Sequence, residues 1–182
     1  MRLIAVFSIL AALLLAAPPL RAEGCTCSPD PFESRWNAAD AVFTGTVIEI
    51  KELHQYIRKG NANDKPVSVL LRVNDKFKGP DTLAAGSGFE LQTSLTRDTC
   101  TGHPFEKGKD YLVYAYQRSP DKYDPTSLYN MPSGSYDVGG LCGGTKALTN
   151  DQAVSEVAQI RKKLVDEPEE KPRGLFDRMF GN

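Results

Sequence analysis

Four cysteines are the residues of this chain whose type and spacing could do chemistry: Cys25, Cys27, Cys100 and Cys142. An even number of cysteines in an exported chain indicates disulfide bonds, and four cysteines can pair in three ways. A direct bridge between Cys25 and Cys27 would close a small, strained ring, so we discount it. Both other pairings attach the segment that contains Cys25 and Cys27 to distant parts of the chain.

Two other uses of these cysteines have to be weighed. Cys100 and His103 are spaced like metal ligands, so together with Cys25 and Cys27 they could hold a structural zinc ion. Disulfides suit an oxidising compartment better than such a zinc site does. Thiol–disulfide exchange is a poor alternative, because the chain has no Cys-x-x-Cys motif.

The N-terminus has the pattern of a secretory signal peptide. Arg2 gives a positive start, and residues 3–17 form an uncharged apolar run that is short for a membrane-spanning helix. We therefore expect residues 1–24 to be removed. The mature protein is then expected to be secreted, extracellular or periplasmic, with no membrane span.

The cleavage position decides which chemistry Cys25 can do. Cutting after Gly24 makes Cys25 the first residue, whereas cutting after Ala22 leaves Glu23 and Gly24 in front of it. Lipidation of Cys25 is less favoured, because Glu23 lies where small or apolar residues are preferred. As the first residue, Cys25 could chelate a metal ion with its α-amino group and its carbonyl oxygen. The ordinary α-amino pKa of about 7.7–8.0 leaves a useful fraction of this amine neutral.

The overall composition is that of one globular domain. The chain has 182 residues, of which 41% are hydrophobic and 25% charged, so it is neither disordered nor fibrous. Its formal net charge of -1 argues against a nucleic-acid-binding protein, which would usually carry a basic excess.

Runs of β-branched and aromatic residues predict a mainly β protein. Gly45 interrupts the first run and suggests a bulge or a tight bend. The polar segment from Lys51 to Lys65 is expected to be an extended hairpin loop. Together the runs suggest a five-stranded antiparallel barrel of the OB-fold type over residues 25–148, which on pattern alone is one of several all-β folds that they fit. The expected strands are 41–50, 67–73, 89–93, 111–116 and 136–138.

A helix is predicted at each end of the barrel. The first would be capped by Asp30, have Pro31 as its first residue and end near Ala39, with Phe32 and Trp36 facing the core. The second covers 149–165 and would pack on the barrel. Thr149 and Gln152 would form its capping box, and its predicted apolar side comprises Val154, Val157, Ile160 and Leu164. The charged, proline-interrupted tail 166–182 is expected to be disordered.

Several stretches resemble one family in the order in which they occur. Cys25-Thr26-Cys27-Ser28-Pro29 at the expected mature start resembles the tissue inhibitors of metalloproteinases. The later stretches that fit are Ala39-Asp40-Ala41-Val42-Phe43, Asp75-Lys76-Phe77-Lys78-Gly79, Cys100 with Gly102, Gly108-Lys109-Asp110-Tyr111-Leu112-Val113 and Leu141-Cys142-Gly143.

The resemblance implies a netrin-like OB-fold domain with disulfides Cys25–Cys100 and Cys27–Cys142. Two departures limit the likeness to the inhibitory half of the family. No cysteine near Trp36 could form the family's third bridge, and residues 147–182 contain no second cysteine-rich domain. We therefore expect a single-domain relative.

The resemblance also implies a mechanism, in which the chain inhibits zinc metalloendopeptidases. The amine and carbonyl of Cys25 would bind the protease zinc and displace its water, which is the nucleophile of the protease. Thr26 would enter the neighbouring specificity pocket. The residues expected to form this inhibitory wedge are Cys25, Thr26, Cys27, Ser28, Asp98 and Thr99. The inhibitor would need no cofactor and would not be an enzyme.

A non-inhibitory binding module for a protein or a glycan is the competing hypothesis. It would use the 52–65 loop or a tyrosine-rich surface, although alternate tyrosines could equally fill the core. The tyrosines in question are Tyr111, Tyr114, Tyr116, Tyr123 and Tyr129. An enzyme is disfavoured, because His54 and His103 are the only histidines and no catalytic arrangement is visible around them.

Overall fold

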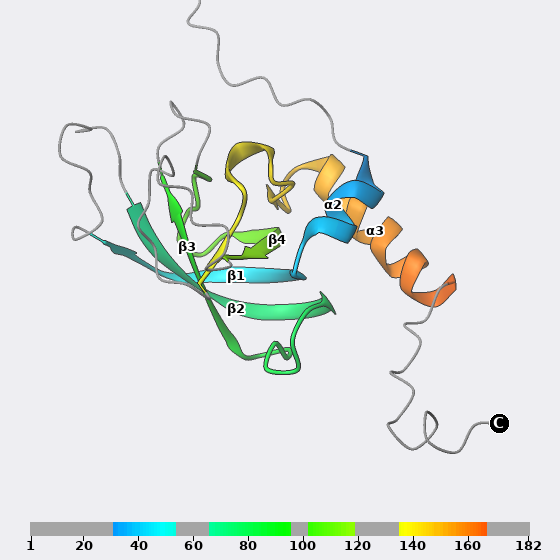
Figure 1. Ribbon diagram of the computed structural model, residues 1–182, viewed down its shortest axis with the longest axis horizontal. Coiled ribbons are helices and arrows are strands. Elements are labelled where there is room, and N and C mark those ends of the chain that lie inside the picture. The colour runs from blue at the N-terminus through cyan, green and yellow to red at the C-terminus, as the bar shows by residue number, and fades with distance from the viewer. Residues whose placement is uncertain (1–30, 54–65, 96–101, 119–134, 167–182) are drawn as a thin grey trace, which may run out of the picture.

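The β-branched runs form one antiparallel sheet with a helix before and after it (Figure 1). The computed structural model describes residues 31–53, 66–95, 102–118 and 135–166. Along the chain the strands are β1 (Ala41–Glu52), β2 (Pro66–Lys78), β3 (Gly88–Ser94), β4 (Asp110–Gln117), β5 (Tyr136–Asp137) and β6 (Lys146–Ala147). The predicted mainly β fold is confirmed, and the short strand β6 is an addition to it.

The sheet order is β3-β2-β1-β4-β5, with β6 paired to β4. Its two end strands approach each other through side chains, since the rings of Phe89 on β3 and Tyr136 on β5 lie 4.9 Å apart. Among the described residues no hydrogen-bonded ladder joins β3 to β5. Closure of the sheet into a barrel therefore stays a prediction.

Gly45 marks an irregularity in β1, as predicted. The register with β2 shifts between Thr44 and Gly45. A Cβ atom at Gly45 would lie 3.1 Å from the carbonyl oxygen of Arg72 and equally close to the Phe43 ring. The register therefore shifts where a side chain on β1 would crowd the backbone of β2.

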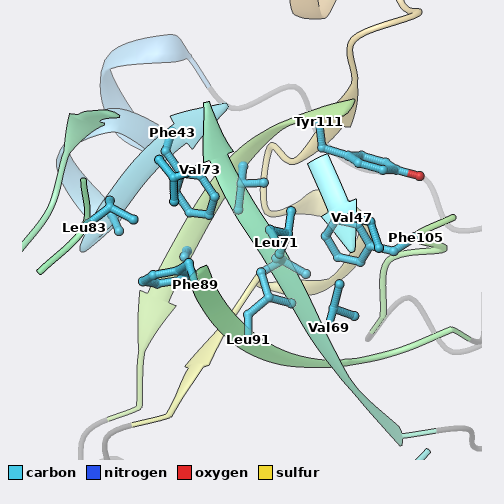
Figure 2. Packing of buried hydrophobic residues seen from close by; sticks show 14 of the residues in the cluster. Phe43, Val47, Val69, Leu71, Val73, Leu83, Phe89, Leu91, Phe105 and Tyr111 are labelled. Carbon is cyan, nitrogen blue, oxygen red and sulfur yellow. The ribbon is translucent and has the colours of Figure 1, made fainter. Parts of the chain in front are cut away.

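The inner face of the sheet carries the main hydrophobic core. Figure 2 shows side chains from different strands converging there, among them Val47 from β1, Leu71 from β2 and Leu91 from β3. A second cluster lies between the sheet and the two helices, α2 (Phe32–Ala38) and α3 (Asp151–Asp166). The buried residues of this second cluster are Trp36, Ala39, Val42, Phe77, Leu112, Tyr114, Val157 and Ile160.

The structure corrects the predicted helix starts. Pro31 is the N-cap of α2, so the predicted start, with Asp30 as the cap and Pro31 as the first helical residue, is wrong. In α3 the amide of Gln152 donates to Asn150 Oδ1 over 2.8 Å, so Asn150 replaces Thr149 as the cap. An Asn side chain accepts from the first turn as well as Thr does.

The predicted apolar side of α3 is correct except at one position. Val157 and Ile160 are buried and Leu164 packs against them, but Val154 is 55% exposed. Ala153 and Glu156 instead complete the buried face. No helix among the described residues is long and apolar enough to cross a membrane.

Candidate functional site

Most of the predicted inhibitory wedge lies outside the described residues. This holds for Cys25, Thr26, Cys27, Ser28, Asp98 and Thr99, and also for Cys100. Cys142 is described and lies in the short 3₁₀ turn η3 (Gly140–Cys142), between β5 and β6. Cys142 is not a free thiol. Its pairing with Cys27 stays a prediction.

The backbone around Cys142 is shaped by glycines. Gly139 and Gly140 have positive φ angles of 62° and 70°, a conformation that side chains with a Cβ atom adopt at a cost. Gly143 crosses Val138 so closely that a Cβ atom would lie 1.7 Å from the Val138 carbonyl oxygen. The Tyr116 hydroxyl donates to the Gly143 carbonyl over 2.9 Å. These contacts hold Cys142 in one place relative to β4.

Helix α2 lies beside this turn. A cavity of about 310 Å³ separates them, and its walls come from both elements and from β4. The lining residues are Ser34, Arg35, Ala38, Tyr116, Gly139, Cys142 and Gly143. The helix that follows the Cys25–Ser28 segment in the sequence is thus a neighbour of Cys142.

A buried carboxylate ties α2 to the rest of the molecule. Glu156 on α3 is 7% exposed and has partners on three other elements. Its Oε1 accepts hydrogen bonds from the Arg35 guanidinium on α2 over 2.7 Å and from the Tyr114 hydroxyl on β4 over 2.6 Å. Its Oε2 accepts from the Lys146 ammonium on β6 over 2.6 Å.

These contacts change the acidity of both the carboxylate and the phenol. Burial favours the neutral form of Glu156, but the hydrogen bonds from Lys146, Tyr114 and Arg35 outweigh it and hold its pKa below the ordinary value. Burial, and then the hydrogen bond to the Glu156 carboxylate, raise the pKa of Tyr114. Glu156 is therefore a buried anion balanced by two cations, and Tyr114 is a neutral donor to it.

Lys78 also fixes the C-terminal end of α2. The Lys78 ammonium donates to the carbonyl oxygens of Trp36 over 2.8 Å and of Ala39 over 2.6 Å. These carbonyls lie at the C-terminal end of the helix, where a cation is favourable. Lys78 belongs to the Asp75–Gly79 stretch on which the family resemblance rests in part.

The described residues on either side of the segment that carries Asp98, Thr99 and Cys100 contact each other at the end of β3. Beyond it, the amide of His103 donates to Thr93 Oγ1 on β3 over 3.2 Å. Gly102 lies so close to β3 that a Cβ atom would be 2.0 Å from the Ser94 carbonyl oxygen. The chain therefore leaves β3 after Ser94 and returns beside it.

His103 is buried between aromatic rings. Its ring lies 4.8 Å from that of Phe105 and 5.6 Å from that of Tyr111, both edge to face. Within the described part of the chain, no group of three or more His, Cys, Asp or Glu residues could hold a metal ion. The cysteines of the alternative zinc site, and His54, lie outside that part.

The proposed tyrosine-rich surface is wrong for two of its members. Tyr111 and Tyr114 are 3% and 0% exposed, because both belong to the hydrophobic clusters of the fold. Tyr116 is half-buried against the Cys142 turn. Tyr123, Tyr129 and most of the 52–65 loop lie outside the described residues, although β1 itself continues through Glu52.

No known family model matches this chain, and a search of curated proteins gives no significant match.

Proposed function

We propose that this protein is an exported inhibitor of zinc metalloendopeptidases that uses the amine and carbonyl of an N-terminal Cys25 as zinc ligands. The sequence support is the Cys25-Thr26-Cys27 motif directly after a signal peptide, together with the ordered resemblance to the tissue inhibitors of metalloproteinases. In this proposal the sheet closes into an OB-fold barrel, and the contact between Phe89 and Tyr136 lies at the closure.

The observation that carries the proposal is the position of α2 against the Cys142 turn. Three residues separate Cys27 from Pro31, where the described helix segment begins. A chain of that length spans at most about 14 Å. A helix that shares a cavity with Cys142 therefore leaves Cys27 within reach of it, as the proposed Cys27–Cys142 bridge requires.

The residues before and after the 96–101 segment, which contains Cys100, lie side by side at the end of β3. This arrangement supports the second proposed bridge, Cys25–Cys100. Gly102 and His103 contact β3 beside Ser94 and Thr93, so the described chain resumes at the end of that strand, two residues after Cys100. Two bridges would hold Cys25 rigidly, which lowers the ordering cost of binding. Asp98 and Thr99 would then lie next to the zinc ligands.

Rigidity matters because the amine and the carbonyl of Cys25 would have to be held at the correct distance and angle to bind the protease zinc. A catalytic zinc keeps one coordination site open, and a water molecule normally occupies it. The neutral Cys25 amine and the Cys25 carbonyl would replace that water, so the protease would lose its nucleophile. Thr26, whose side chain is short, would occupy the pocket for a substrate side chain.

The first test is to purify the exported protein, determine its intact mass and assay it against a panel of zinc endopeptidases. We expect a mature chain that begins at Cys25 and inhibits at least one zinc enzyme. A serine endopeptidase is the control and should be unaffected. A Cys25 chain with intact disulfides that inhibits none of the zinc enzymes would count against the proposal.

A further inference from the structure

We propose that Glu156 is a positioning residue for the inhibitory N-terminus, acting through Arg35 on α2. The inference rests on the proposed function, and it extends the inhibitory unit beyond residues 25–148 to a helix that the family resemblance does not cover. Glu156 would not touch the protease. Its role would be to fix the direction in which the chain enters α2.

The contacts around Arg35 give this role its physical basis. The Arg35 guanidinium bonds to Glu156 over 2.7 Å, and its side chain packs on the backbone of Gly144. A Cβ atom at Gly144 would lie 2.6 Å from Arg35 Cδ. Gly144 follows Cys142 after a single intervening residue. Arg35 thus joins α2 both to α3 and to the turn that carries the proposed bridge.

The chain that follows the Cys142 turn also bonds to the Glu156 carboxylate, through Lys146. Lys146 bonds to Glu156 over 2.6 Å, and β6, which contains it, directly follows the glycine-rich turn. Glu156 therefore holds the two stretches of chain that the Cys27–Cys142 bridge would connect. The helix that follows Cys27 in the sequence and the strand that follows Cys142 thus share one carboxylate.

A second ionic contact between the two helices is weaker. Lys163 on α3 and Glu33 on α2 lie 3.2 Å apart, but the Glu33 side chain is 59% exposed. Exposed ion pairs contribute little to stability, whereas removing one partner of a buried network leaves its other charges uncompensated. The position of α2 is therefore expected to depend on Glu156 far more than on Glu33.

The test compares Glu156→Gln with wild type in two measurements, made below the unfolding temperature of both. Amide hydrogen exchange reports on α2 directly, and we expect its protected amides to exchange at least about tenfold faster in the variant. We also measure the inhibition constant against a zinc endopeptidase that wild type inhibits. It is expected to rise at least about tenfold in the variant, because a less ordered N-terminus loses more conformational entropy on binding.

Two further variants keep the test decisive. Arg161→Gln on the same helix removes an ion pair with Asp75 whose side chains are 62% and 52% exposed, and it should change neither measurement. If Glu156→Gln does not fold, Arg35→Met takes its place, because it leaves Glu156 paired with Lys146 and should give the same two changes.

The outcomes separate this inference from the proposed function. A lower melting temperature with unchanged α2 exchange and an unchanged inhibition constant would show a merely structural role and overturn the inference. If wild type inhibits no zinc endopeptidase, the proposed function fails and the inhibitory role of Glu156 fails with it. Exchange in α2 then still decides whether Glu156 positions that helix.

Discussion

The Tyr114 hydroxyl donates a hydrogen bond to Glu156 Oε1 over 2.6 Å, and this contact joins the centre of the sheet to the C-terminal helix. Tyr114 is fully buried and Glu156 nearly so. A buried polar pair of this kind is favourable only when all its members are satisfied. Arg35 and Lys146 complete the set, so one carboxylate links the sheet to both helices.

The acid stability of the protein should depend on Glu156. Its pKa is held below the ordinary value in the folded state, whereas an unfolded Glu has a pKa of about 4.3. Its stabilising contribution is therefore fully present above about pH 4.3 and is lost as the pH falls through the lower folded-state pKa. We expect the melting temperature of wild type to fall more steeply below about pH 4 than that of Glu156→Gln.

Thermal unfolding followed by circular dichroism between about pH 2 and pH 7 measures this difference. If the melting temperatures of the two proteins fall equally steeply below about pH 4, the pKa of Glu156 does not differ between the folded and unfolded states, which would contradict the account.

The Cys142 turn should not tolerate a side chain at Gly143. An alanine Cβ would lie 1.7 Å from the Val138 carbonyl oxygen, so the backbone of the turn has to move. We expect Gly143→Ala to cost at least about 3 kcal/mol of the free energy of unfolding, measured in urea. Gly86→Ala is the control, because nothing lies within 4 Å of its Cβ position.

The positive φ angle of 83° at Gly86 should cost only about 1–2 kcal/mol in that control. A Gly143→Ala variant as stable as Gly86→Ala would contradict the close crossing of the turn over Val138.

Docking of α3 on the sheet should depend on Ile160. This side chain is fully buried in the cluster with Trp36 and Leu112, so truncation leaves a cavity. Ile160→Ala is expected to cost about 2–5 kcal/mol in the free energy of unfolding. Val154→Ala, on the exposed side of the same helix, should stay within about 0.5 kcal/mol of wild type. Similar losses for both variants would show that α3 is held in another orientation.

Local pattern in the sequence is enough to predict five of the six described strands and the irregularity at Gly45. A β-branched run such as that around Val47 can bury one face only as a strand, and a lone glycine within it indicates a close backbone approach. The helix starts were harder, because Thr149 and Asn150 are both good caps and only the path of the preceding chain decides between them.

The buried network was beyond sequence reasoning for a different reason. Arg35 and Glu156 are 121 positions apart, and a charged residue within a helix normally indicates a solvent-exposed side. The one available signal was that Glu156 lies next to Val157 on the apolar side of α3. Tyr111 and Tyr114 were similarly ambiguous, since an amphipathic ring suits both a surface and a core.

The glycine contacts of the site were also partly visible in the sequence. Gly139, Gly140, Gly143 and Gly144 surround Cys142 and predict turns, but they do not show which glycine crosses Val138. Gly102 gave no signal of its close approach to Ser94, because that contact depends on where the chain returns to the sheet.

The most direct test of the central claim is to lengthen the mature N-terminus by one residue. A protein that begins Ala-Cys25 keeps all four cysteines but moves the free amine away from the Cys25 carbonyl, so the two can no longer form a five-membered ring on zinc. We predict that the Cys25 form inhibits a zinc endopeptidase and that the Ala-Cys25 form, with the same disulfides by mass, does not. Equal inhibition by the two forms would contradict zinc chelation by the terminus.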